Sequence, residues 1–207
     1  MSSNRGLLVV IEGVNGAGKT TIINELVKRY QSLKVPIVVY KFPNRQGLHG
    51  ERIDNYLKGQ ISISSKYDVL DMFSANRASV RDNIVREVNT GHIVICDRYV
   101  YSAIAYHIPL TVQDPKLIEI YSNIIGHFDH TMPIPHITYL IEGNHLAKRG
   151  IASPEIFHYI GSKTYKIHDM IRRVICSYTH RCAIIKNYNN KLDDTVRYIM
   201  ADINLMR

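Results

Sequence analysis

A glycine-rich segment near the start of the chain carries the residue types that bind nucleotide phosphates. Residues 13–20 read Gly-Val-Asn-Gly-Ala-Gly-Lys-Thr, a full match to the P-loop pattern, between an apolar run and an amphipathic stretch. In such a loop backbone N–H groups surround the phosphates, Lys19 reaches the terminal ones and the Thr20 hydroxyl is available to Mg²⁺. A glycine-rich turn that only caps a helix is the alternative. We predict an ATP or GTP site with Mg²⁺ at these residues: Gly13, Asn15, Gly16, Ala17, Gly18, Lys19, Thr20 and Thr21.

A carboxylate at the end of a later apolar run fits the same chemistry. Asp97 directly follows the apolar residues 93–96. An apolar strand beside a P-loop can deliver a carboxylate to the shell of a bound metal ion. Taken alone, an aspartate at a strand end is more often a turn residue or a helix cap. Because the P-loop is present, we predict that Thr20 and Asp97 hold the metal.

The elements that must position these groups can be predicted from the apolar pattern. Five short β-branched runs predict strands buried on both faces, at residues 7–11, 37–40, 93–96, 137–141 and 183–185. Helical periodicity marks residues 19–33, 69–88, 115–125, 154–178 and 193–205. This alternation predicts an α/β fold with a five-stranded parallel sheet and helices on both faces. Nucleotides should bind beyond the carboxyl ends of the strands.

Composition limits the class of protein. The 207 residues are 45% hydrophobic and 21% charged, which predicts one globular domain over residues 1–207. The net charge of +8 favours an anionic ligand, but the basic residues are scattered, so nucleic acid is not the favoured partner. No apolar run approaches the length of a membrane span. Cys96, Cys176 and Cys182 lack metal-ligand spacing and are interpreted as buried thiols of a reducing, cytoplasmic compartment.

Three further segments resemble one family. Residues 97–106 read DRYVYSAIAY and resemble the DRYxxSxxAY segment of thymidylate kinases, which phosphorylate dTMP to dTDP. Residues 42–45, FPNR, resemble the FPxR loop of that family, and residues 73–77, FSANR, resemble its helix in the form seen in eukaryotic and large-DNA-virus members. With the P-loop, these motifs span the first half of the chain. The resemblance implies a P-loop NTPase fold with a mobile lid, Mg²⁺ as cofactor, ATP and dTMP as substrates, and a homodimer.

The resemblance also implies roles for individual residues. Arg45 and Arg98 would hold the acceptor phosphate, since a guanidinium stays charged and binds oxygens bidentately. Phe73 would stack on thymine, Arg77 would donate to a ring carbonyl, and Tyr106 would disfavour a ribose 2′-hydroxyl. A surface or ion-pair role is the alternative for each phosphate arginine, and a core Phe beside a solvated Arg is the alternative for Phe73 and Arg77. The implied dTMP site comprises Asn15, Phe42, Arg45, Phe73, Arg77, Arg98 and Tyr106.

The chain departs from the family pattern at several positions. Asn15 stands where most members have an acidic residue, and Gly16 stands where eukaryotic members have a basic one. The lid, at about residues 143–157, contains Lys148 and Arg149, so we expect these two side chains to supply the missing charge to ATP. Ile156-Phe157 and His136 also differ from the pattern. The implied catalytic residues are Lys19, Asp97, Arg98 and Arg149.

Other functions share parts of this pattern. A deoxynucleoside kinase also joins a P-loop to an Asp-Arg segment, but it needs a carboxylate base after the early strands, and residues 42–45 offer none. A nucleoside monophosphate kinase of broader or different base specificity remains open. A non-catalytic, nucleotide-dependent protein that binds nucleic acid would have no use for a base pocket, a lid and two acceptor arginines together.

Overall fold

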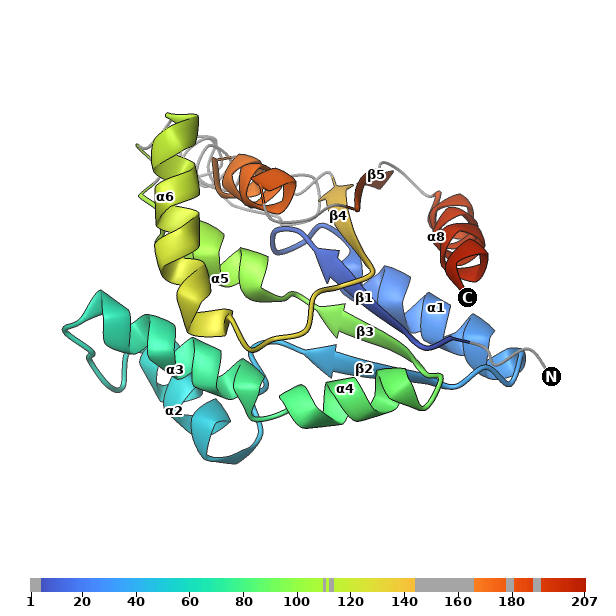
Figure 1. The fold of residues 1–207 in the computed structure, drawn as a ribbon, viewed down its shortest axis with the longest axis horizontal. Coiled ribbons are helices and arrows are strands. Elements are labelled where there is room, and N and C mark those ends of the chain that lie inside the picture. The colour runs from blue at the N-terminus through green and yellow to red at the C-terminus, as the bar shows by residue number, and fades with distance from the viewer. Residues whose placement is uncertain (1–4, 110, 112–113, 144–165, 178–180, 188–190) are drawn as a thin grey trace, which may run out of the picture.

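Five parallel strands form the centre of the fold, in the order β2-β3-β1-β4-β5 (Figure 1). The strands are β1 (Leu7–Glu12), β2 (Ile37–Lys41), β3 (Ile93–Asp97), β4 (Ile137–Gly143) and β5 (Cys182–Asn187). This computed structural model describes residues 5–109, 111, 114–143, 166–177, 181–187 and 191–207. All five predicted strands are confirmed as strands. Their predicted burial on both faces holds for the central strands β1, β3 and β4. It is wrong for β2 and β5, where Val39 and Ile184 are exposed, because these two strands form the edges of the sheet.

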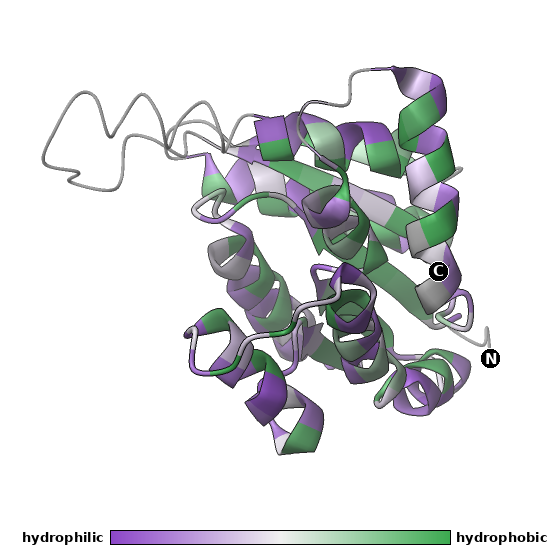
Figure 2. Ribbon diagram, turned by 90° about the vertical axis from the view of Figure 1, so that its left-hand side faces the viewer, coloured by the Kyte–Doolittle hydropathy of each residue, from purple (hydrophilic) through white to green (hydrophobic). Residues whose placement is uncertain are grey.

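Helices cover the sheet. They are α1 (Lys19–Ser32), α2 (Gly47–Leu57), α3 (Lys66–Ala78), α4 (Arg81–Asn89), α5 (Val100–His107), α6 (Pro115–Gly126) and α8 (Leu192–Met206), with a 3₁₀ turn η1 (His127–Asp129). Residues 166–177 are also helical. Figure 2 shows green, hydrophobic strands inside and helices whose turns alternate between green and purple. This is the pattern expected of amphipathic helices around an apolar sheet.

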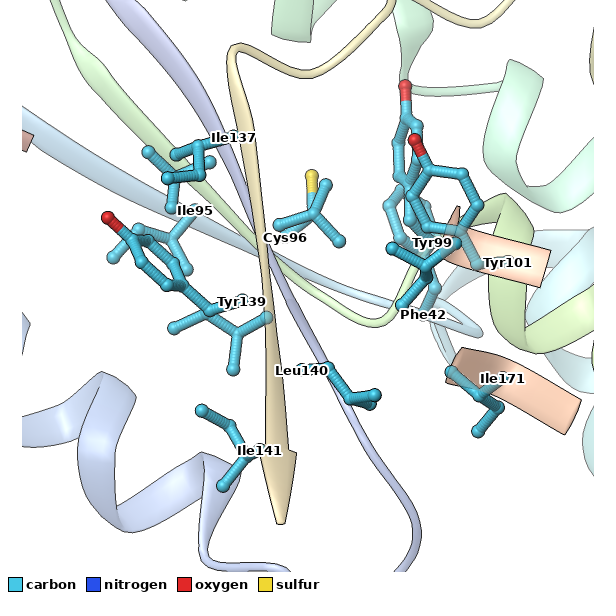
Figure 3. Packing of buried hydrophobic residues seen from close by; sticks show 14 of the residues in the cluster. Phe42, Ile95, Cys96, Tyr99, Tyr101, Ile137, Tyr139, Leu140, Ile141 and Ile171 are labelled. Carbon is cyan, nitrogen blue, oxygen red and sulfur yellow. The ribbon is translucent and has the colours of Figure 1, made fainter. Parts of the chain in front are cut away.

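The core lies on both sides of the central strands. Every residue of β1 and β3 is buried. In Figure 3, Ile137, Tyr139 and Ile141 of β4 point toward the side of α1, whereas Leu140 points the other way, toward Ile171. Alternate residues of one strand therefore serve two separate helix layers. The prediction of an α/β fold with helices on both faces is confirmed.

The predicted helix over residues 69–88 is wrong as a single element. The chain forms α3 and α4 instead, with a turn at Ser79 and Val80 in which the Ser79 hydroxyl donates to the Asn76 carbonyl at 2.9 Å. The first of them also begins earlier, because Ser65 accepts from the backbone N–H groups of Tyr67 and Asp68. The sequence interpretation did not predict α2 or α5. The predicted helix over residues 154–178 is described only from 166 to 177.

The interpretation of the cysteines is confirmed for one thiol and wrong for two. Cys96 is buried in β3, where burial raises the pKa of its thiol, but Cys176 and Cys182 are exposed. Cys176 stands at the end of a helical stretch and Cys182 begins the edge strand β5, so neither lies under a covering layer. Within the described ranges, the helices are too short or too polar to span a bilayer.

Candidate functional site

The loop between β1 and α1 has the backbone of a phosphate cradle. Gly16 and Gly18 have φ values of +84° and +94°, a left-handed conformation that side chains disfavour. α1 begins directly at Lys19, so its first N–H groups face the loop. The Lys19 ammonium is buried and donates to the carbonyls of Gly13 at 2.9 Å and Val14 at 3.0 Å. The loop is thus preformed around one lysine.

A polar pocket opens above this loop at the carboxyl ends of β2 and β3. Its lining is Asn15, Gly16, Gly18, Lys19, Thr20, Thr21, Lys41, Asp97 and Arg98. Asp97 is level with Ile11 of β1 and with Lys41 of β2 in the strand register. The predicted phosphate-binding residues in this stretch are therefore brought together at one edge of the sheet.

Two oxygen-bearing side chains of the polar pocket fit a hard cation. Asp97 is buried, and its Oδ1 atom has no hydrogen-bond partner. Thr20 lines the same pocket. Within the described ranges no group of three or more His, Cys, Asp or Glu side chains gathers. That combination suits Mg²⁺, which is commonly held by one or two carboxylates together with substrate phosphates and water.

The charges of the polar pocket act on one another. Burial, with the positive charge of Arg98 and to a lesser degree that of Lys41, lowers the pKa of Lys19 to about 8. The negative charges of Asp97 and Glu12 act in the opposite direction. Bringing phosphate oxygens to the ammonium would favour its charged form. The polar pocket is therefore electrostatically arranged for an anion.

Arg98 is held at the boundary of the polar pocket by a set of directed contacts. Its backbone is left-handed, with φ +70°, and its N–H donates to the Ile11 carbonyl at 3.0 Å. The guanidinium donates to Ser102 Oγ at 3.0 Å and to Asn15 Oδ1 at 2.7 Å. It also lies 6.0 Å from the ring centre of Tyr106. A non-glycine residue in this conformation is commonly found where function requires it.

Glu12 anchors this arrangement, and the sequence interpretation missed it. The carboxylate is fully buried and accepts from the N–H groups of Tyr99 at 2.8 Å and Ser102 at 3.1 Å, and from Ser102 Oγ at 2.5 Å. A carboxylate at the start of α5 also interacts favourably with the helix dipole. Glu12, Ser102, Arg98 and Asn15 form one continuous chain of hydrogen bonds.

A second, apolar pocket adjoins the first. It is lined by Asn15, Phe42, Pro43, Arg45, Tyr56, Leu57, Val69, Phe73, Arg77, Arg98, Tyr99, Ser102, Ala103, Tyr106 and His107. Asn15 and Arg98 line both pockets. The polar pocket and the apolar pocket thus meet at one guanidinium. All seven residues implied for the acceptor site line the apolar pocket.

Arg77 is neither solvated nor fully available to a ligand. It is buried, and it donates from Nε and Nη2 to the buried carboxylate of Asp129 at 2.8 and 2.6 Å. Asp129 also accepts from Ser74 Oγ at 3.2 Å. Because two of its nitrogens serve this pair, Nη1 is the nitrogen that remains for the pocket. The alternative of a solvated arginine is wrong, because the Arg77 side chain is buried. Its carboxylate partner lies 52 residues later in the sequence, in η1.

The loop at residues 42–45 is fixed to α3. Asn76 accepts from the Asn44 N–H at 2.8 Å and donates to the Asn44 carbonyl at 2.7 Å. On its other side the loop packs against Gly50, where an added Cβ would lie 2.3 Å from the Arg45 carbonyl carbon. Arg45 itself is exposed and pairs with Asp54 at 2.6 Å, so the ion-pair alternative describes its present contact. The two nearby cations lower the pKa of Asp54, led by the hydrogen bond from Lys58.

The comparisons with known proteins identify the family of this chain. Residues 11–192 match the family model for thymidylate kinase, which is most of the chain. The chain belongs to the thymidylate kinase family. A thymidylate kinase of Schizosaccharomyces pombe is 39% identical over 103 residues, or 50% of this chain and 49% of that protein. One from Dictyostelium discoideum is 35% identical over 103 residues, or 49% and 46%. The chain spans about half the length of the curated relatives it matches.

Solved thymidylate kinase structures have the same fold. The Candida albicans enzyme superposes with a TM-score of 0.72 at 25% identity, covering 97% of this chain and 92% of that one. The thymidylate kinase of Ehrlichia chaffeensis gives a TM-score of 0.64 at 22% identity, covering 96% and 99%. The five-stranded P-loop fold is therefore that of the family over almost the whole chain.

Some residues expected from the thymidylate kinase pattern cannot be placed. Lys148, Arg149 and the predicted lid beyond Gly143 lie outside the described residues. Gly143 itself ends β4 and abuts the P-loop, where an added Cβ would lie 2.7 Å from the Ala17 carbonyl oxygen. His136, one of the departures from the family pattern, accepts from the Leu8 N–H through Nδ1 at 2.9 Å, so it has a structural role between strands.

Proposed function

We propose that this chain transfers the γ-phosphoryl group of ATP to dTMP, giving ADP and dTDP. The observation that carries the proposal is that the polar pocket above the P-loop and the apolar pocket beside it share Arg98 and Asn15. A donor in the first pocket and an acceptor in the second would meet at a fixed positive charge. Phosphoryl transfer depends on such positioning and charge stabilisation.

The side chains of the acceptor pocket favour a monophosphate over a nucleoside. Among the described residues, its lining includes Arg45, Arg77 and Arg98 but no carboxylate. A hydroxyl acceptor would need a general base, whereas a phosphate oxygen is already anionic at neutral pH. We assign the acceptor phosphate to Arg98 and Arg45, with Arg45 leaving Asp54 when the phosphate binds. These features favour a monophosphate kinase over a deoxynucleoside kinase.

We assign recognition of the acceptor base and sugar to the aromatic wall. Phe73 would stack on thymine, and Nη1 of Arg77 would donate to a ring carbonyl while Asp129 fixes the guanidinium plane. Tyr106, which lies against Arg98, would occupy the space of a 2′-hydroxyl. Phe42 is buried beneath this wall. Together these side chains support thymidine monophosphate in the deoxy form.

The donor side would hold ATP on the P-loop with Mg²⁺. Thr20 and Asp97 are the residues that would hold the metal, which would supply positive charge to offset that of the phosphates. Lys19 would leave the loop carbonyls and donate to the terminal phosphates. We also propose that the lid, within a single domain, supplies Lys148 and Arg149. The three cysteines are free thiols, which supports a reducing, intracellular setting.

A coupled assay of ADP formation tests the proposal. With ATP and Mg²⁺, turnover with dTMP should exceed turnover with dUMP, dGMP, UMP and thymidine. Lys19→Ala is the matched control, and its activity should be lost with every acceptor. Faster turnover with thymidine than with dTMP would make the chain a nucleoside kinase. If none of these acceptors is phosphorylated, the proposal that the chain is a kinase for any of the tested monophosphates is refuted.

Affinity for ADP is expected to depend on pH through Lys19. Because its pKa is lowered to about 8 in the free site, the ammonium loses its proton just above neutrality. Phosphates favour the charged form, so ADP affinity should fall as pH rises above about 8, approaching tenfold per pH unit. Titration calorimetry between pH 7 and 10 measures this. Lys19→Ala should bind more weakly with no such slope, and a flat wild-type profile would contradict the assignment.

A homodimer is the assembly we propose, with α6 at its interface. Leu117, Ile120, Tyr121 and Ile124 follow one face of this helix and are exposed within the described part of the chain. Their spacing of three and four residues is that of a helix face that packs on a partner. Ile120→Glu should therefore give a monomer in sedimentation velocity where the wild type is a dimer. Lys116→Glu, beside the stripe, is the matched charge control and should leave the dimer intact.

A further inference from the structure

Lys41 is a cation of the P-loop pocket that no motif accounts for. It is the last residue of β2, and its strand neighbour in register is Asp97, so both side chains leave the sheet on the same face. Its side chain lines the pocket together with Lys19, Asp97 and Arg98. The backbone of Lys41 is therefore positioned by the strand register and not by a loop.

The Lys41 ammonium is uncommitted, unlike its neighbours. Arg98 bonds to Asn15 and Ser102, Lys19 bonds to loop carbonyls, and Arg45 pairs with Asp54. Lys41 makes no hydrogen bond or ion pair with any residue that the structure describes, and it is exposed to the pocket. No existing contact has to break before it can donate to a ligand.

Lys41 is the third cation in the lining of the P-loop pocket, and like charges at close range repel one another. Among the residues that the structure describes, Lys19, Lys41 and Arg98 line this pocket with a single carboxylate, that of Asp97. Repulsion of this kind is offset only when a polyanion enters. Cations that are held in place before the reaction are the kind of group that stabilises charge developing in the transition state.

Gly16 of the P-loop leaves the described lining of this pocket without a second cationic side chain from the loop. Gly16 lines the same pocket and has no side chain, so Lys19 is the one cationic side chain that the P-loop segment contributes to the described lining. We propose that Lys41 contacts the phosphoryl group in transit and stabilises its negative charge, as a catalytic residue. This inference rests on the proposed function. In the step, an acceptor phosphate oxygen bonds to the γ-phosphorus, the bond to the bridging oxygen breaks, and its electron pair stays on ADP. No proton transfer is required.

Single-turnover kinetics of wild type, Lys41→Met and Lys41→Arg test the role of Lys41. Lys41→Met keeps the aliphatic stem and removes the charge, so the rate of phosphoryl transfer should fall about 10²-fold with KM for ATP and dTMP changed less than about threefold. Lys41→Arg should recover most of that rate. Lys28→Met, an exposed lysine on α1, is the matched control and should behave as wild type. A loss below about threefold, or a loss confined to KM, would overturn the proposal.

A binding measurement separates this inference from the proposed function. ADP, dTMP and aluminium fluoride together imitate the phosphoryl group in transit, whereas ADP and dTMP alone imitate the ground state. Lys41→Met should bind the two nucleotides as the wild type does but lose the added affinity for the fluoride complex. Equal affinity of both proteins for that complex refutes the role of Lys41. If the wild type neither phosphorylates dTMP nor binds the complex, the proposed function fails and Lys41 loses its role with it.

Discussion

Replacing Lys19 with alanine is expected to lower kcat for dTMP phosphorylation at least about 10³-fold. The lysine is buried at the start of α1, and its ammonium is the cation nearest the P-loop carbonyls. With ATP present it would be the charge that follows the terminal phosphates through the reaction. Removing it also weakens ADP binding, so both the affinity and the rate should fall.

The fold itself should survive that substitution. Burial lowers the pKa of Lys19, which means that the charged amine is unfavourable in the empty site. The free Lys19→Ala protein should therefore melt at the same temperature as the wild type or above it, while the rise in melting temperature on adding ADP is lost. Thermal scans with and without ADP measure both effects. A variant that keeps more than a tenth of wild-type kcat would refute the role.

Replacing Glu12 with alanine is expected to lower the free energy of unfolding by about 3–5 kcal/mol, because buried donors lose a charged partner. The carboxylate serves the N–H groups of Tyr99 and Ser102 and the Ser102 hydroxyl, and none of these is exposed. Urea unfolding followed by circular dichroism measures the change. The same substitution should lower kcat, because Ser102 would no longer hold Arg98.

Glu12→Gln serves as the graded control. It keeps one side-chain oxygen for the two N–H groups but brings an amide donor toward the Ser102 hydroxyl, so its loss of stability should be smaller, about 1–2 kcal/mol. Ser102→Ala should disturb Arg98 without exposing the N–H groups of α5. If Glu12→Ala unfolds within 1 kcal/mol of the wild type, the carboxylate does not anchor α5.

The sequence predicted the parts of the molecule that depend on local pattern. Continuous β-branched runs define the five strands, and a P-loop must follow a strand and open a helix. The break between α3 and α4 was missed because helical periodicity continues across Ser79 and Val80, where a side chain takes up the Asn76 carbonyl. Helix periodicity also cannot show whether a cysteine at the end of an element is covered.

Contacts between distant residues decided what the sequence did not predict. Arg77 was assigned by motif, but its partner Asp129 and the resulting direction of its guanidinium come from packing of η1 on α3. In the sequence, Glu12 is only a residue that follows an apolar run. The fold brings the start of α5 into hydrogen-bonding contact with its carboxylate. Lys41 could have been found from the sequence with one further piece of information, the strand order. Because Lys41 and Asp97 are paired in register on neighbouring parallel strands, their side chains leave the sheet on the same face.

The double hydrogen bond between Asn76 and Asn44 fixes the distance between α3 and the loop at residues 42–45. Phe73 and Arg77, which would read the base, and Arg45, which would hold the phosphate, belong to segments that this pair joins into one body. The separation of the two backbone segments is then a property of the scaffold and not of the ligand. An acceptor one phosphate shorter or longer can satisfy one end only at the expense of the other. Discrimination against thymidine and dTDP would thus be built into length, before any chemistry takes place.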